Sequence, residues 1–285
     1  MAGEDIWSPN SQVPRTEVRV LWLAGWLLAM AFAVSPWGYT HLTVPSVSTP
    51  VTPARWTQDI WFVIFGLQAV GMVYQLLPSG YDPDGDKQRC VHATSFLWAL
   101  GAMCTLGWLA ALAQGTPGGT WLGLACILAA LFITLRSLLH LYRLRRQFGR
   151  TSSRLLYLAY FLPTSMLAAW LTLAAATTAV AALIVSVDPA DLDLASLAFL
   201  AGVMLLGAAV TLRQRDTVFG LTLVWGLVGT YEGTSDESAM LQWASLAAVA
   251  LMVVLCALSV LRRKGSQSPS IDIEAQEPLR AHELR

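Results

Sequence analysis

The side chains that could do chemistry inside the apolar parts of this sequence are few. Arg136 and His140 lie four residues apart, so one helix would place them on the same face. Arg136 could either reach the membrane surface or face inward and meet an anionic ligand group. Asp59 stands at the edge of another apolar run, where hydrocarbon would not tolerate a charged carboxylate. The sequence has no phosphate loop, nucleophile elbow or zinc-protease motif, so we expect a protein that is not an enzyme.

Metal and cofactor chemistry has little support. Asp82, Asp84 and Asp86 alternate as in a calcium loop, but the sixth and twelfth positions hold Lys87 and Ala93 instead of Gly and Glu. A solvated turn is the prediction there, and no cofactor is predicted. Four cysteines without metal-ligand or CxxC spacing are expected as small buried residues: Cys90, Cys104, Cys126 and Cys256.

Aromatic side chains are the better candidates for binding, because 12 of the 285 residues are Trp. Five of them lie near the ends of apolar runs, where a belt at the membrane surface would explain them: Trp56, Trp61, Trp98, Trp121 and Trp243. Three lie deeper, where each indole N–H needs an acceptor: Trp108, Trp170 and Trp225. For these three, lining a pocket and packing between helices remain equally good explanations.

The amino-acid composition indicates the class of protein that positions these residues. Hydrophobic residues make up 55% of the chain, charged residues 13%, and the mean hydropathy is +0.56. A soluble domain would carry about 25% charged residues. The chain is therefore predicted to cross a membrane several times. Its net charge of zero argues against nucleic acid as a partner.

Eight apolar runs divide the chain into an all-α bundle. They cover about residues 18–34, 60–77, 92–113, 120–142, 155–185, 194–212, 217–229 and 240–261. A polar segment, 1–17, precedes this transmembrane domain of residues 18–262, and a polar tail, 263–285, is expected to be disordered. The fifth run is long for one span, and Pro163 predicts a kink near its start. The seventh run is short and rich in glycine.

The charges predict the orientation. With eight spans, 16 Lys and Arg residues lie on the side of the two termini and only Arg55 lies on the other. Cytoplasmic loops carry such an excess of cations, so both termini are predicted in the cytoplasm of a multi-pass integral membrane protein. The sequence does not indicate which membrane.

A series of motifs gives a family resemblance. They are Thr52-Pro53-Ala54, Ile60-Trp61, Tyr74-Gln75, Trp108, Pro163 with Trp170, and FGLTLVWGLVG at 219–229. In order and spacing they resemble the long tryptophan-rich sensory proteins, relatives of TspO, the translocator protein also called the peripheral benzodiazepine receptor. Each motif is weak alone, and the order of all of them carries the resemblance.

The resemblance implies a five-helix core with three added C-terminal helices. It also implies a ligand pocket under the loop after the first span, because short members of the family bind porphyrins and animal members bind cholesterol. This sequence departs from the family pattern at four positions that alter the expected polarity of the pocket: Asp59, Phe62, Thr105 and Thr177. The identity of a ligand therefore does not carry over from the family.

These observations predict a membrane receptor for a small hydrophobic ligand, of the tetrapyrrole or sterol class, with a sensory or regulatory role. A transporter or channel is the alternative, and a porphyrin-degrading enzyme is a third hypothesis. The predicted ligand-binding residues are Trp56, Asp59, Trp61, Trp108, Arg136 and Trp170. Arg55 and Asp59 are expected to form an ion pair. The predicted partners are the lipid bilayer, a porphyrin or sterol, and a second copy of the chain in a homodimer.

Overall fold

The computed structural model describes residues 49–76, 85–147, 154–186, 192–234 and 238–265, together with six positions between 20 and 31. Its elements are the 3-10 helix η1 (Arg55–Asp59), α3 (Ile60–Leu76), α4 (Asp86–Leu112), α5 (Pro117–Gln147), α6 (Arg154–Leu156), the π-helix η3 (Tyr157–Phe161), α7 (Leu162–Ile184), α8 (Leu192–Arg213), α9 (Thr217–Gly233) and α10 (Ala239–Gly265). The predicted all-α class is confirmed. The polar segment 1–17 and the tail beyond residue 265 lie outside the described residues.

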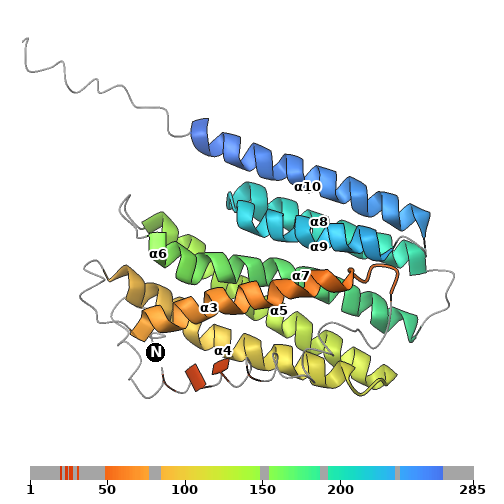
Figure 1. The fold of residues 1–285 in the computed structure, drawn as a ribbon, viewed down its shortest axis with the longest axis horizontal. Coiled ribbons are helices and arrows are strands. Elements are labelled where there is room, and N and C mark those ends of the chain that lie inside the picture. Colours follow the sequence, from red (N-terminus) through yellow and green to blue (C-terminus); the bar gives the residue numbers. More distant parts are fainter. Residues whose placement is uncertain are drawn as a thin grey trace, which may run out of the picture.

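The helices form a layered bundle around α7 (Figure 1). In that view α10 lies on one side, α8 and α9 form the next layer, α7 follows, and α3, α5 and α4 complete the bundle. The helix α7 packs against α3, α5, α8 and α9. In the continuous stretch Arg154–Ile184, 72% of the most apolar window is buried, compared with 28–44% in the other candidate spans. Any site in the bundle core is therefore built around α7.

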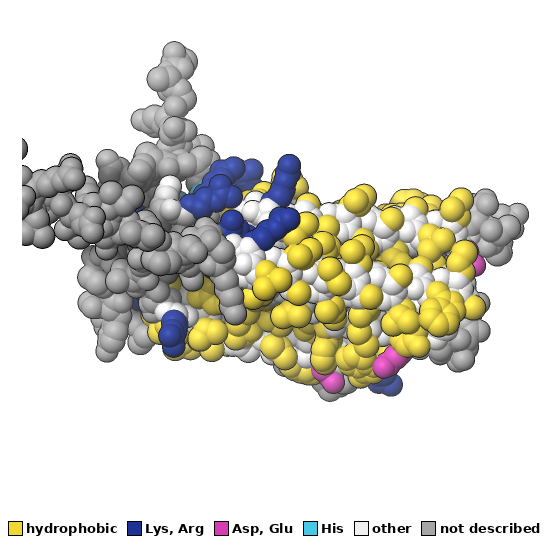
Figure 2. All heavy atoms as spheres, turned by 90° about the horizontal axis from the view of Figure 1, so that it is seen from above, with side chains coloured by type: hydrophobic (Ala, Val, Ile, Leu, Met, Phe, Trp, Pro, Cys, Tyr) yellow, Lys and Arg dark blue, Asp and Glu magenta, His cyan; other side chains and the backbone are white. Residues whose placement is uncertain are grey.

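Six helices of the described chain are long and apolar enough to cross a membrane. Large apolar side chains cover their outer surfaces, and Leu205, Leu194 and Phe132 are each at least 67% exposed (Figure 2). Such a surface suits lipid and not water. The helix α9 has 17 residues, about 26 Å at 1.5 Å per residue, and packs against α7 and α10. The predicted first span lies almost wholly outside the described residues.

Two helices begin several residues before the apolar runs from which they were predicted. The helix α4 starts at Asp86 and not near His92, and its N-cap Gly85 has a φ of 72°, a left-handed conformation that suits glycine. The helix α5 starts at Pro117, a residue suited to the first turn of a helix. Apolar runs mark the part of a helix that meets lipid, and helices extend past it into the polar surface.

The fifth span contains the predicted irregularity. The π-helix η3 lies directly before α7, which starts with Pro163 in its first turn. A proline inside a helix lacks an N–H and clashes with the carbonyl four residues earlier, and a π-turn relieves this clash. The helix α3 packs closely here, because a Cβ added at Gly71 would overlap the carbonyl oxygen of Ala159. By contrast, nothing lies within 4 Å of a Cβ added at Gly66 of the same helix.

Three tryptophans attach the neighbouring helices to α7. Trp98 Nε1 donates to Thr164 Oγ1 at 3.1 Å, and Trp108 Nε1 donates to Thr178 Oγ1 at 3.1 Å. Trp121 Nε1 donates in the same way to Ser186 Oγ at 3.0 Å, just past the end of α7. Each of these indoles has its acceptor, so their first role is to hold α4 and α5 against the central helix.

Apart from Arg136 within α5, the Lys and Arg residues whose side chains the structure describes lie toward the two ends of the bundle. One end, where α5, α8 and α10 finish, carries Lys87, Arg89, Arg143, Arg145, Arg146, Arg154, Arg213, Arg215 and Arg262. The opposite end, where α3 begins and α9 finishes, carries Arg55. Figure 2 shows the Lys and Arg side chains of one face gathered mainly near one end of the apolar surface. The cytoplasmic position of the basic end stays a prediction.

Candidate functional site

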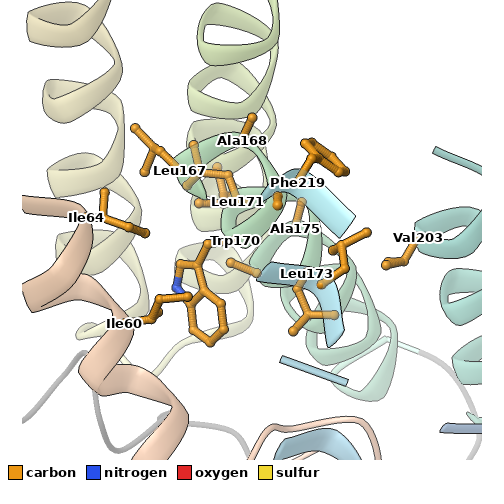
Figure 3. Packing of buried hydrophobic residues seen from close by; sticks show 14 of the residues in the cluster. Ile60, Ile64, Leu167, Ala168, Trp170, Leu171, Leu173, Ala175, Val203 and Phe219 are labelled. Atoms are coloured by element: carbon orange, nitrogen blue, oxygen red, sulfur yellow. The ribbon is translucent and has the colours of Figure 1, made fainter. Parts of the chain in front are cut away.

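An aromatic cluster lies where α3 meets α7. Trp61 is only 3% exposed and stacks on Phe65, with ring centroids 5.3 Å apart. Its ring also meets the edge of Trp170, whose centroid is 6.4 Å away. Figure 3 shows Trp170 projecting from α7 beside Ile60 of α3. The structure therefore brings together Trp61 and Trp170, two of the residues that the sequence predicts to bind a ligand.

Trp61 differs in one respect from Trp98 and Trp108, the tryptophans that hold α4 against α7. Its Nε1 is fully buried and has no hydrogen-bond partner, whereas Nε1 of Trp98 and of Trp108 each has a threonine acceptor. A buried donor without a partner costs about 1–3 kcal/mol, so native proteins rarely keep one. Through the indole N–H of Trp61, the cluster can offer a hydrogen bond, beside flat aromatic surfaces, to an apolar ligand that carries an acceptor.

The segment 49–59, called the strap here, leads into α3 and lies against α9. Ala54 N donates to Gly229 O at 2.8 Å. Trp225 Nε1 donates to Thr57 O at 3.1 Å, and Trp56 Nε1 donates to Glu232 Oε2 at 2.6 Å. The rings of Trp56 and Trp225 also meet edge to face, with centroids 4.7 Å apart. One face of α9 thus holds the strap through side chains and backbone.

Glycines on α9 allow this approach. A Cβ added at Gly226 would overlap Leu173 Cδ2 and lie 3.3 Å from the ring of Trp170. A Cβ added at Gly229 would overlap the methyl group of Thr57, and one at Gly233 would overlap the carbonyl oxygen of Thr52. Spacings of three and four residues place these glycines on adjoining parts of one helix surface. This surface of α9 therefore touches both the aromatic cluster and the strap.

A buried carboxylate fixes the other end of α9. Asp216 is 5% exposed and caps the helix, because its Oδ1 accepts from the N–H groups of Val218 at 3.0 Å and Phe219 at 3.1 Å. Its Oδ2 accepts from Tyr142 of α5 and from Ser165 of α7, the latter at 2.7 Å. Asp216 therefore ties the start of α9 to both α5 and α7.

The remaining predicted site residues lie apart from these contacts or serve packing. Trp108 is engaged by Thr178, as described above. Arg136 is exposed, which favours the explanation in which it reaches toward the membrane surface. Asp59 is exposed at the end of η1, and the structure does not pair it with Arg55. That expected ion pair is wrong because η1 has three residues per turn, so residues four apart do not share a face.

The contribution of α9 to the site is not among the predictions from the sequence. Asp216 directly precedes an apolar run, which is a standard helix-start signal, but it is not among the predicted site residues. Trp225 was seen as a deep tryptophan, but it is 41% exposed and donates to the strap. No sequence pattern pointed to a role for Glu232. Conversely, Trp61 and Trp98 are 3% and 4% exposed, so they do not belong to the surface belt suggested by their positions.

Among the residues that the structure describes, no group of three or more His, Cys, Asp or Glu could hold a metal ion. The cysteines in this part of the chain are free thiols, and Cys90 and Cys256 are buried. The aromatic cluster consists of Trp61, Phe65 and Trp170, so its chemistry is that of shape, apolar contact and indole N–H donors.

The fold and the site define a class: a multi-pass α-helical membrane protein with an aromatic cluster between its second predicted span and its central helix. The chain matches the family described as TSPO-like protein over residues 22–258, and it belongs to that family. The match covers the five-helix core and the added helices α8, α9 and α10. The comparison with curated proteins found no match, and neither did the comparison with solved structures.

Proposed function

We propose that this protein binds a small hydrophobic ligand of the tetrapyrrole or sterol class at the aromatic cluster of Trp61, Phe65 and Trp170, and that it has a sensory or regulatory role. The observation that carries the proposal is the buried indole N–H of Trp61, which lacks an acceptor inside the protein. A carbonyl, hydroxyl or ring nitrogen on a ligand would satisfy it. Membership of the TSPO-like family supports the same class of ligand.

The chemistry of the cluster supports binding and not catalysis. Trp61 lies among Ile60, Ile64 and Trp170, none of which can transfer a proton or attack a substrate. A ligand bound there would gain apolar contact worth roughly 25 cal/mol per Å² of buried surface. We therefore propose that the ligand leaves chemically unchanged and that its binding is the signal.

The test is a titration of tryptophan fluorescence in detergent with protoporphyrin IX and, separately, with cholesterol. Wild type should be quenched by protoporphyrin IX, or shifted by cholesterol, in a saturable way. Trp61→Phe should weaken the apparent affinity by about threefold to twentyfold, the value of one hydrogen bond and the lost ring area. Mass spectrometry of the recovered ligand should show an unaltered mass.

Trp98→Phe is the matched control, because it deletes the same atoms from a tryptophan whose N–H is already bonded to Thr164. This variant should lower stability and leave ligand affinity within about twofold of wild type. If neither ligand gives saturable binding to wild type, or if the two variants weaken binding equally, the proposed site is wrong.

A further inference from the structure

The contacts of α9 carry an inference about how the proposed ligand site is controlled, and this inference rests on the proposed function. We propose that α9 is the element that holds the strap closed over the aromatic cluster, so that Trp225 and Gly229 set how often the strap opens and how fast a ligand enters and leaves. The strap is the segment 49–59, and its last residue directly precedes α3.

The first step is that the strap and the aromatic cluster are adjacent along the backbone, so that a movement of the strap reaches the cluster. Asp59 ends η1, Ile60 begins α3 and Trp61 follows at once. Thr57 of the strap is fully buried, and its carbonyl oxygen accepts from Trp225. A strap that leaves α9 must therefore move the backbone two to four residues before Trp61.

The second step is that α9 touches both parts through one surface. Gly226 packs on Trp170 and Leu173, and Gly229 packs on Thr57 one turn further along. The strap is held by three hydrogen bonds to α9, from Ala54 N, to Thr57 O and from Trp56 Nε1. The two indoles in these bonds are 37% and 41% exposed, so they lie at the edge of the bundle and not in its core. Bonds at an edge can open without unfolding the bundle.

The third step is that the start of α9 is fixed independently. Asp216 bonds Tyr142 and Ser165 at the opposite end of the helix. The strap therefore closes against a helix that is already anchored to α5 and α7. Opening is a local movement of the strap, and α9 stays in place.

Two variants test this. Trp225→Phe removes the donor to Thr57 but keeps an aromatic ring, which should raise the open population about twofold to tenfold, the value of one hydrogen bond. Gly229→Ala should act more strongly, because its Cβ would overlap Thr57. Gly202→Ala on α8 is the matched control, since nothing lies within 4 Å of a Cβ added there.

The measurement is stopped-flow quenching of the full-length protein by protoporphyrin IX, with dissociation followed by transfer to excess lipid vesicles. Cholesterol replaces protoporphyrin IX if only cholesterol binds in equilibrium titrations. Both the association and dissociation rates should rise about twofold to tenfold in Trp225→Phe, with the equilibrium affinity changed by less than either rate. Hydrogen exchange of residues 49–59 should accelerate in the same variant, and exchange in α4 and α5 should not change. Gly202→Ala should match wild type in both measurements.

These measurements distinguish a failure of the gating inference from a failure of the proposed function. If wild type binds ligand saturably and strap exchange rises in Trp225→Phe while the ligand rates stay fixed, the gating inference is overturned and the proposed function stands. If strap exchange does not change in either variant, α9 does not hold the strap, and the inference is again overturned. If wild type shows no saturable binding of either ligand, the proposed function is wrong, and the inference that α9 controls ligand entry is overturned with it.

Discussion

Replacing Asp216 tests whether the buried carboxylate anchors α9 to the core. The change Asp216→Ala removes the N-cap of α9, worth about 1 kcal/mol. It also leaves the hydroxyls of Tyr142 and Ser165 buried without their acceptor, at about 1–3 kcal/mol each. The expected loss in the free energy of unfolding is about 3–7 kcal/mol, a large part of the roughly 5–15 kcal/mol typical of folded proteins. Asp216→Asn keeps an acceptor for the helix N–H groups and should lose less.

A thermal melt with a thiol-reactive dye in detergent measures this, because Cys90 and Cys256 are buried free thiols that become reactive on unfolding. At the 2–4 °C per kcal/mol typical of soluble domains of about 150–250 residues, Asp216→Ala should lower Tm by roughly 6 °C or more. Asp193→Ala is the control, since Asp193 is only half-buried and accepts one hydrogen bond, from Ser238 at 3.2 Å. The reasoning is refuted if both alanine variants melt within about 1 °C of wild type.

A double-mutant cycle separates a specific interaction from general damage. Tyr142→Phe and Asp216→Asn both act on one hydrogen bond, so their effects should not add, and the coupling energy should be about 0.5–3 kcal/mol. Additive effects, with the double variant losing the sum of the two single losses, would mean that the carboxylate and the phenol act independently.

Two further predictions concern packing and orientation. Gly71→Ala should lower the Tm measured with the same dye, by the equivalent of about 1–3 kcal/mol, because its Cβ would overlap the backbone of η3, whereas Gly66→Ala should melt at or above wild type; equal melting of the two would contradict the close approach of α3. In a background with all four cysteines replaced, a membrane-impermeant thiol reagent on intact cells should label Arg55→Cys and not Arg213→Cys. The reverse pattern would place the termini outside the cytoplasm, and this test applies to expression in a surface membrane.

The spans could be predicted because lipid imposes a simple rule. A run of about 18 apolar residues satisfies its backbone hydrogen bonds in hydrocarbon by forming a helix. Such a run therefore predicts a transmembrane helix directly. The irregularity at Pro163 was equally accessible, since a proline in the interior of a helix leaves a backbone carbonyl without its donor. Helix starts such as Asp86 were less accessible, because the residues beyond the membrane are polar and follow turn chemistry.

The candidate site was only partly accessible from the sequence. Trp61 and Trp170 were predicted from their types and order, but the burial of Trp61 depends on which helix lies beside it, and a single sequence does not contain that information. The prediction of an Arg55–Asp59 ion pair was wrong for a local reason. The four-residue spacing rule assumes an α-helix, and the chain forms a 3-10 helix there. The role of Glu232 follows from a contact across 176 residues, which no local pattern indicates.

The contacts of α9 also indicate what the added helices do in this member of the TSPO-like family. If α8, α9 and α10 were an appendage, their interface with the core would consist of interchangeable apolar contacts. Instead α9 supplies the carbonyl of Gly229 and the carboxylate of Glu232 to the strap, and its N-cap Asp216 accepts from two core helices. Cutting the chain before α9 would leave the hydroxyls of Tyr142 and Ser165 without an acceptor in an apolar environment and would uncover Trp170. The five-helix core of this protein is therefore not expected to be stable alone, and the added helices are part of its proposed ligand site.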